Sequence, residues 1–174
     1  SEILKKLSLN PKVEDEFLNA NLTFEDYINE IVRSFEEISK KKFKVNFEQF
    51  KDKIILGKST EIIYGLRNFI GNANKFSKKK IDISLINNEG KTKVVIVDDG
   101  NGFPKDLIDK DKLGEPYIRT VDSVNSSKQG LGLGTFIGKT LLEKNFATVQ
   151  CRNSKTRSGA EVIIKWKNND LFNI

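Results

Sequence analysis

The chain has 174 residues, of which 37% are hydrophobic, and a formal net charge of +6. This length and composition fit one domain with a buried core and exclude a disordered chain or a disulfide-stapled miniprotein. The single cysteine, Cys151, cannot form an internal disulfide and favours a reducing compartment. Because the chain has no histidine, catalytic triads and metal sites that need histidine are excluded.

The basic residues are densest in two runs, Lys40–Lys42 and Lys78–Lys80. Such runs are typical of helix C-termini, where positive charge is favourable. Nucleic-acid binding is the weaker interpretation, so we expect no nucleic-acid partner. The sequence shows no signal peptide and no apolar run of membrane-spanning length.

We divide the chain into a lead-in, residues 1–20, and one domain, residues 21–174. Thr23 and Asp26 form a capping-box pattern, and apolar residues at helical spacing behind it predict a helix over residues 24–39. Alternating residues predict a strand over residues 43–47 and a second, short strand over residues 53–56.

The next predicted helix, residues 59–77, carries two different stripes. Its apolar residues follow a period of 3.6, whereas Asn68, Asn72 and Lys75 recur at i, i+4 and i+7, roughly opposite them. Two glycines interrupt this helix, and each costs about 1 kcal/mol relative to alanine. The glycines and the polar stripe suggest room for something close to the backbone, although a solvated face with incidental asparagines would look the same.

The second half of the chain alternates between strands and glycine-rich turns. Residues 81–85 and 93–97 predict a hairpin, which the sequence Asp98–Pro104 ends. Residues 105–129 show little periodicity and are typical of a functional lid or a disordered segment. The glycines at 130, 132 and 134 precede another helix, and strands at 148–152 and 160–166 follow, with Cys151 expected as a small buried hydrophobe.

This element order predicts an α+β fold. We expect a two-layer α/β sandwich, in which helices cover one face of a mixed, mostly antiparallel sheet.

Asp98 directly follows a predicted buried strand, so its carboxylate should lie at the rim of the core and need a hydrogen-bond donor. The exocyclic amine of adenine is one suitable donor. Gly100 and Gly102 would allow a tight turn and leave no side chain to block a flat ring. A plain Asp-Gly turn that closes a strand is the structural alternative.

The alternating glycines from Gly130 to Gly134 could direct backbone N–H groups and a helix N-terminus at phosphates. They do not form the dinucleotide fingerprint, which needs its third glycine at Thr135. Gly138-Lys139-Thr140 resembles the end of a P-loop, but Leu133 stands where that motif needs its earlier glycine.

Together the three motifs resemble the ATP-binding catalytic domain of sensor histidine kinases, in the gyrase, Hsp90, histidine-kinase and MutL group. Residues 68–76 are similar to its N box, residues 98–103 to its first glycine box and residues 130–134 to its second. Residues 113–117 and 136–143 look most like the RegB/PrrB redox-responsive kinases. The resemblance implies the Bergerat-type ATP-binding fold.

The resemblance implies a role for each matching residue. Asn72 would supply an oxygen to Mg²⁺, Lys75 would neutralise phosphate charge, and Asp98 would receive the adenine amine. Asn68 and Lys75 would be the catalytic residues, and ATP and Mg²⁺ the cofactors. The residues implied to bind nucleotide are Asn68, Asn72, Lys75, Phe76, Asp98, Gly100, Gly102, Phe103, Arg119, Thr120, Lys128, Gly130, Leu131, Gly132, Leu133, Gly134 and Thr135.

Asn68 distinguishes kinase from ATPase. Hydrolysing members of the group carry a glutamate at this position, where it activates water as a general base. A carboxamide cannot take the proton, so phosphoryl transfer to a protein is favoured over hydrolysis. The same residue argues against an anti-sigma-type protein-serine kinase, whose usual residue here is glutamate. The other alternative is a degenerate module of this fold that serves only protein–protein contact.

The phospho-accepting histidine of the family is absent from this chain. The resemblance therefore implies that the chain acts on its own dimerisation and phosphoacceptor domain in a full-length homodimer, with a response regulator downstream. Residues 1–20 could be a remnant of that domain. The chain would be cytoplasmic, in a protein anchored in the bacterial inner membrane through an N-terminal region absent here.

Overall fold

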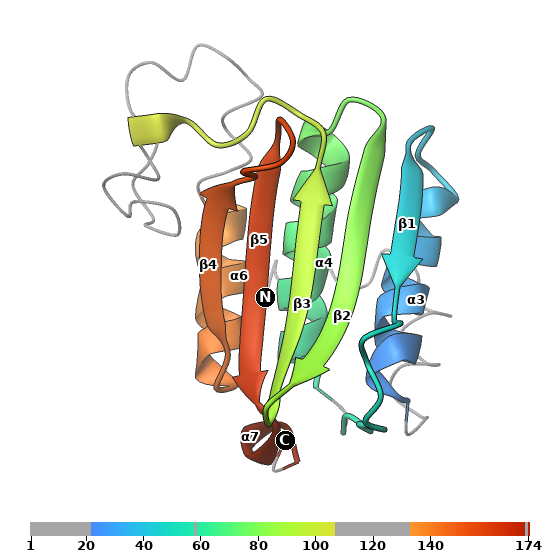
Figure 1. Ribbon diagram of the computed structural model, residues 1–174, viewed down its shortest axis with the longest axis vertical. Coiled ribbons are helices and arrows are strands. Elements are labelled where there is room, and N and C mark those ends of the chain that lie inside the picture. The colour runs from blue at the N-terminus through green and yellow to red at the C-terminus, as the bar shows by residue number, and fades with distance from the viewer. Residues whose placement is uncertain (1–21, 58, 107–132, 173) are drawn as a thin grey trace.

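The computed structural model describes residues 22–57, 59–106, 133–172 and 174. In this part of the chain, three long helices cover one face of a five-stranded sheet (Figure 1). The elements are α3 (Phe24–Glu36), β1 (Lys42–Asn46), α4 (Thr60–Phe76), β2 (Lys80–Asn88), β3 (Lys91–Asp98), α6 (Leu133–Lys144), β4 (Thr148–Asn153), β5 (Ala160–Lys167) and α7 (Asn168–Leu171). None of the described helices is both long and apolar enough to cross a membrane.

The strands lie in the order β1-β2-β3-β5-β4. β1 pairs with β2 in parallel, and the other neighbours are antiparallel. Behind the sheet, α3 lies against β1, α4 against β2 and β3, and α6 against β4 (Figure 1). The predicted two-layer α+β sandwich with a mixed, mostly antiparallel sheet is therefore confirmed. The predicted lead-in, residues 1–20, and most of the predicted lid lie outside the described residues.

The capping box at the start of α3 forms as predicted. The Thr23 hydroxyl accepts a hydrogen bond from Asp26 N at 3.2 Å, and the Asp26 carboxylate accepts one from Thr23 N at 3.1 Å. The helix ends at Glu36 instead of Ser39. Ile38 lies within the predicted range but is 80% exposed, so packing does not extend the helix that far.

The predicted strand over residues 53–56 is wrong. Only an isolated bridge joins Ile55 to Thr23 there, with Phe24 N donating to Ile54 O at 2.9 Å. The alternation itself is real, since Ile54 and Leu56 are buried and Ile55 is half exposed. The segment packs its apolar residues into the core, but its backbone pairs with residues 22–24 at the start of α3. It therefore adds no strand to the sheet.

The core lies between the sheet and the helices and is almost wholly apolar. Trp166 of β5 packs edge-on to Phe24 at a ring-centroid distance of 5.5 Å, and its indole N–H donates to Asn145 O at 3.0 Å. Every polar side-chain atom of the described residues that is itself fully enclosed has a hydrogen-bond partner. Cys151, expected to be buried, is half-buried against the edge of this core.

The two glycines of α4 leave room for other parts of the protein. A Cβ atom at Gly65 would lie 2.5 Å from Leu142 Cγ and 3.1 Å from Gly138 O, both on α6. A Cβ atom at Gly71 would lie 3.3 Å from the edge of the Phe35 ring on α3. Gly65 therefore sets how closely α4 and α6 approach each other.

We expect Gly65→Ala to destabilise the fold by up to about 2 kcal/mol in urea unfolding. Overpacking of a core costs about 1–3 kcal/mol, and the better helix propensity of alanine returns about 1 kcal/mol. Leu142 is fully buried and cannot move aside cheaply. Gly71→Ala in the same helix is the matched control and should cost less, because Phe35 is only partly buried. Equal costs for the two variants would contradict this account of the α4–α6 contact.

Candidate functional site

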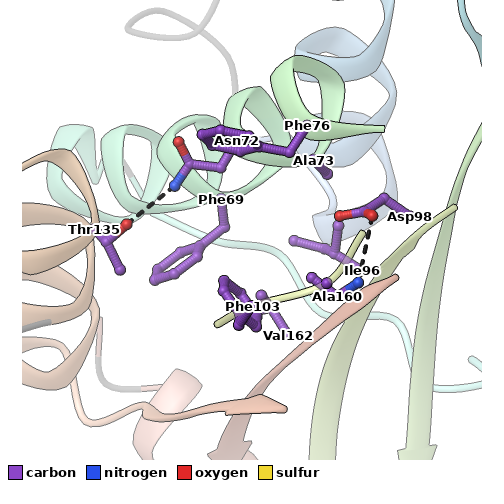
Figure 2. A pocket seen from close by; sticks show the side chains of 11 residues that line it. Phe69, Asn72, Ala73, Phe76, Ile96, Asp98, Phe103, Thr135, Ala160 and Val162 are labelled. Atoms are coloured by element: carbon purple, nitrogen blue, oxygen red, sulfur yellow. Dashed lines mark hydrogen bonds between the residues drawn. The ribbon is translucent and has the colours of Figure 1, made fainter. Parts of the chain in front are cut away.

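A cavity of about 50 Å³ lies between α4, α6 and the ends of β3 and β5 (Figure 2). Its walls are mainly apolar. Asp98 lies at one end of it, and Asn72 and Thr135 lie at the other. The apolar walls come from Phe69, Ala73, Phe76, Ile96, Phe103 and Val162. The structure therefore brings the predicted N-box helix, the first glycine turn and the start of α6 to one place.

Asp98 ends β3 with its side chain in the rim of the core, as the sequence predicts. The residue is only 5% exposed, and its Oδ1 accepts hydrogen bonds from Gly100 N at 2.8 Å and Ala160 N at 3.3 Å. Burial raises the pKa of this carboxyl, and the two backbone hydrogen bonds only partly oppose that effect. None of the described residues donates a hydrogen bond to Oδ2, so this oxygen can accept one from a ligand.

Asp99 is the next residue and has a structural role. Its Oδ1 accepts hydrogen bonds from the backbone N–H groups of Lys78, Lys79 and Lys80 at 2.8, 3.0 and 3.3 Å. Partial burial raises the pKa of Asp99, but the hydrogen bonds from these backbone N–H groups have the larger combined effect. The pKa of Asp99 is therefore lowered. Asp99 thus fastens the glycine turn to the segment between α4 and β2, while Asp98 faces the cavity.

The first glycine turn needs glycine at two positions for different reasons. A Cβ atom at Gly100 would lie 2.2 Å from Phe76 O, because the turn presses against the end of α4. Gly102 has a φ of +80°, which a residue with a side chain rarely adopts. Gly100 therefore allows the turn to approach the end of α4, and Gly102 allows its left-handed backbone conformation.

Asn153, at the end of β4, is a site residue that the sequence did not reveal. Its Oδ1 accepts a hydrogen bond from Phe103 N at 2.7 Å, and its Nδ2 donates to Phe103 O at 3.1 Å. The side chain therefore holds the backbone of a residue whose ring lines the cavity. The available signal was a single asparagine before a polar turn, which does not identify a partner 50 positions away.

Asn68 and Asn72 face α6 instead of open solvent. Asn72 Nδ2 donates to Thr135 Oγ1 at 3.1 Å, and Asn68 Nδ2 donates to Tyr64 O at 3.1 Å. A Cβ atom at Gly134 would lie 3.0 Å from Asn68 Oδ1, so this turn of α6 rests on the asparagine. Thr135 is therefore part of the contact between the two helices.

Lys75 and Phe76 end α4 next to the cavity. The Lys75 side chain is exposed, and its Nζ lies 5.3 Å from the centroid of the Phe76 ring. Leu133 is half exposed at the start of α6. Other predicted nucleotide-binding residues lie outside the described residues, namely Arg119, Thr120, Lys128, Gly130, Leu131 and Gly132.

A family model described as "Histidine kinase-, DNA gyrase B-, and HSP90-like ATPase" matches residues 57–170, which include both asparagines, the first glycine turn and the start of α6. The chain belongs to this ATPase family. The predicted family is thereby confirmed.

Relatives of this ATPase domain include sensor histidine kinases. Sensor histidine kinase RegB of Cereibacter sphaeroides is 36% identical over 99 residues, which cover 54% of this chain and 21% of the relative. A putative sensor histidine kinase NtrY-like of Rickettsia felis is 28% identical over 129 residues, which cover 72% of this chain and 20% of the relative. The chain thus spans about a fifth of the length of the curated relatives it matches.

Solved structures agree on the fold of this ATPase domain. The mycobacterial sensor histidine kinase MprB superposes with a TM-score of 0.65 at 20% identity, over 83% of this chain and 94% of that one. The catalytic domain of histidine kinase ThkA superposes with a TM-score of 0.67 at 20% identity, over 84% and 94% of the two chains.

The contact between Asn153 and Phe103 generates a prediction. We expect Asn153→Ala to lower the free energy of unfolding by about 1–3 kcal/mol, because it leaves a backbone donor and acceptor without partners. The amide of Phe103 should also exchange its hydrogen faster in native-state exchange. Asn153→Asp keeps the acceptor for Phe103 N and should protect that amide better than alanine does. Unchanged exchange at Phe103 in the alanine variant would contradict the proposed contact.

Proposed function

We propose that the chain is the ATP-binding catalytic domain of a sensor histidine kinase, which transfers the γ-phosphoryl group of ATP to a histidine on a domain outside this chain. One observation carries the proposal. An apolar cavity in a chain of this ATPase family has a buried carboxylate, Asp98, at one end and an amide, Asn72, at the other. The carboxylate can accept a hydrogen bond from the adenine amine, and the amide oxygen can hold the Mg²⁺ of the phosphates.

We assign the adenine to the Asp98 end. Because Oδ1 of Asp98 is already bonded to two backbone N–H groups, Oδ2 is left to accept the exocyclic amine. The aromatic rings of Phe69, Phe76 and Phe103 line the walls and suit a flat heterocycle. A buried carboxylate that meets an N–H donor gives specificity, because a base without that donor would leave the charge unpaired.

We assign the triphosphate to the Asn72 end. Mg²⁺ commonly takes one or two protein oxygens and fills its other positions with phosphate oxygens and water, so a single amide oxygen fits it. None of the described residues donates a hydrogen bond to Asn72 Oδ1, which leaves this oxygen available to hold the ion. Bound Mg²⁺ would neutralise triphosphate charge. The exposed Lys75 ammonium, one turn further along α4, would add to that neutralisation.

Asn68 favours transfer over hydrolysis. A general base for water must accept a proton, and the Asn68 amide instead uses its Nδ2–H to bond Tyr64 O. Catalysis would therefore consist mainly of holding the γ-phosphoryl group in position and neutralising its charge. The absence of a glutamate here also disfavours the protein-serine kinase alternative.

The proposal requires partners beyond this chain. The chain has no histidine, so the phosphate acceptor must belong to the dimerisation domain of the full-length homodimer, with a response regulator receiving the phosphate afterwards. We further propose a cytoplasmic position for this domain, in a protein anchored in the bacterial inner membrane.

Calorimetric titration of ATP and ADP, with and without Mg²⁺, tests the proposal. We expect binding near 1 μM, or about −8 kcal/mol, that depends on Mg²⁺. Asp98→Asn should weaken binding about 10- to 100-fold, because an N–H group replaces the oxygen that accepts the adenine amine. The asparagine keeps an Oδ1 for Gly100 N and Ala160 N, so the fold should survive. A folded wild type that binds no nucleotide would favour the protein-interaction alternative.

The raised pKa of Asp98 predicts a pH dependence of nucleotide affinity. The ionised carboxylate accepts the adenine amine, so affinity should fall as the pH drops through the raised pKa of Asp98. Binding should then release protons, which calorimetry in buffers of different ionisation enthalpy measures. Asp99→Asn should keep this dependence but move it to a lower pH, because the carboxylate of Asp99 does not contact the nucleotide while its negative charge contributes to raising the pKa of Asp98. Loss of the dependence in the Asp99 variant alone would contradict the adenine assignment.

A further inference from the structure

The side chain of Thr135 in α6 is hydrogen-bonded to a side chain of another helix, Asn72 of α4. Thr135 lies in the first turn of α6, is 1% exposed, and its Oγ1 accepts a hydrogen bond from Asn72 Nδ2 at 3.1 Å. The bond joins two helices whose residues are 63 positions apart in the chain. Thr135 lines the cavity, but its hydroxyl is engaged by the Asn72 amide.

In this hydrogen bond the Asn72 amide turns its nitrogen, and not its oxygen, to the Thr135 hydroxyl. Figure 2 shows the amide nitrogen of Asn72 directed at Thr135 and its oxygen directed away from Thr135. The terminal torsion of an asparagine is broad and roughly two-fold, so a free amide could turn either its oxygen or its nitrogen outward. Mg²⁺ binds oxygen and not an amide nitrogen. An amide turned the other way would present N–H groups where an oxygen ligand is needed.

We propose that Thr135 is a positioning residue, which holds the Asn72 amide so that Oδ1 is presented to the metal ion of a bound nucleotide. This inference rests on the proposed function, because it assumes that Asn72 is the metal ligand. It changes the role predicted for Thr135, from contact with the nucleotide to action through Asn72. Residues that orient a metal ligand in this way commonly change metal affinity about 10- to 100-fold when they are altered.

The packing of α6 on α4 does not depend on the hydroxyl. Valine has nearly the shape of threonine, with a methyl group in place of the hydroxyl, so Thr135→Val keeps the buried contact and removes the hydrogen bond. Thr135→Ser removes the methyl group and keeps the hydrogen bond. Thr140 lies exposed on the same helix, so Thr140→Val is a matched control for the substitution itself.

The decisive experiment is calorimetric titration of ADP into wild type and the three variants, with Mg²⁺ and with a chelator. We expect Thr135→Val to reduce the gain in affinity that Mg²⁺ produces by about 10-fold or more, and to leave the affinity in chelator unchanged. Thr135→Ser and Thr140→Val should keep the wild-type gain. Urea unfolding of each variant shows whether the fold is intact.

A second readout needs no nucleotide. In ¹H–¹⁵N spectra of the ligand-free protein, the side-chain amide protons of Asn72 report directly on the hydrogen bond. We expect their signals to shift in Thr135→Val and to stay near their wild-type positions in Thr135→Ser. Unchanged Asn72 signals in the valine variant would overturn the inference, because the hydroxyl would then not be holding the amide.

The calorimetric outcomes separate this inference from the proposed function. If Thr135→Val weakens ADP equally with and without Mg²⁺, its role is packing or nucleotide contact, and the inference is overturned. A full wild-type Mg²⁺ gain in that variant overturns it as well. If the folded wild type binds no nucleotide, the proposed function fails, and the inference fails with it.

Discussion

The contact between the first glycine turn and the C-terminal end of α4 is the constraint on which the site depends. Gly100 comes so close to Phe76 O that a Cβ atom would lie 2.2 Å away, and Asp99 bonds the backbone N–H groups that follow the helix. These two contacts fix the end of β3 against the end of α4. As a result, Asp98 from the sheet and Asn72 from the helix can border the same cavity, although 26 positions separate them in the sequence.

The packing of α6 on α4 completes the cavity. Small residues allow the two helices to come close together. Gly65 of α4 contacts Leu142 of α6, and Gly134 and Gly138 of α6 contact Asn68 of α4. The polar stripe of α4 therefore faces a neighbouring helix, where its amides are half-buried and hydrogen-bonded. This explains why the stripe could be interpreted from the sequence either as a solvated face or as a binding face. It lies mostly in an interface between helices, and Asn72 reaches the cavity at the edge of that interface.

Periodicity and capping residues predicted the fold well, because they record which side chains are buried. The capping box of α3, the hairpin of β2 and β3, and the two layers all followed from such local patterns. The failed strand at residues 53–56 shows the limit, since alternation records the burial of Ile54 and Leu56 but does not say which backbone pairs with the segment. The site was harder for the same reason. No local pattern encodes the tertiary contacts at the site. They include the hydrogen bonds between Asn153 and the Phe103 backbone, and the contacts that direct Asp98 and Asp99 to different places.

The two adjacent carboxylates affect folding in opposite directions. Because the pKa of Asp98 is raised, the stability linked to its protonated form is present below its unfolded pKa and is lost as the pH rises through the raised value. Because the pKa of Asp99 is lowered, its contribution is present above its unfolded pKa and is lost as the pH falls through the lowered value. The ionised form of Asp99 therefore stabilises the turn that holds Asp98, whereas burial disfavours the ionised form of Asp98. A buried carboxyl group whose ionised form is disfavoured by burial, and one of whose oxygens is unbonded by the described residues, is expected where a ligand donor supplies the missing hydrogen bond. The same burial that makes Asp98 unfavourable for folding makes it selective for such a donor.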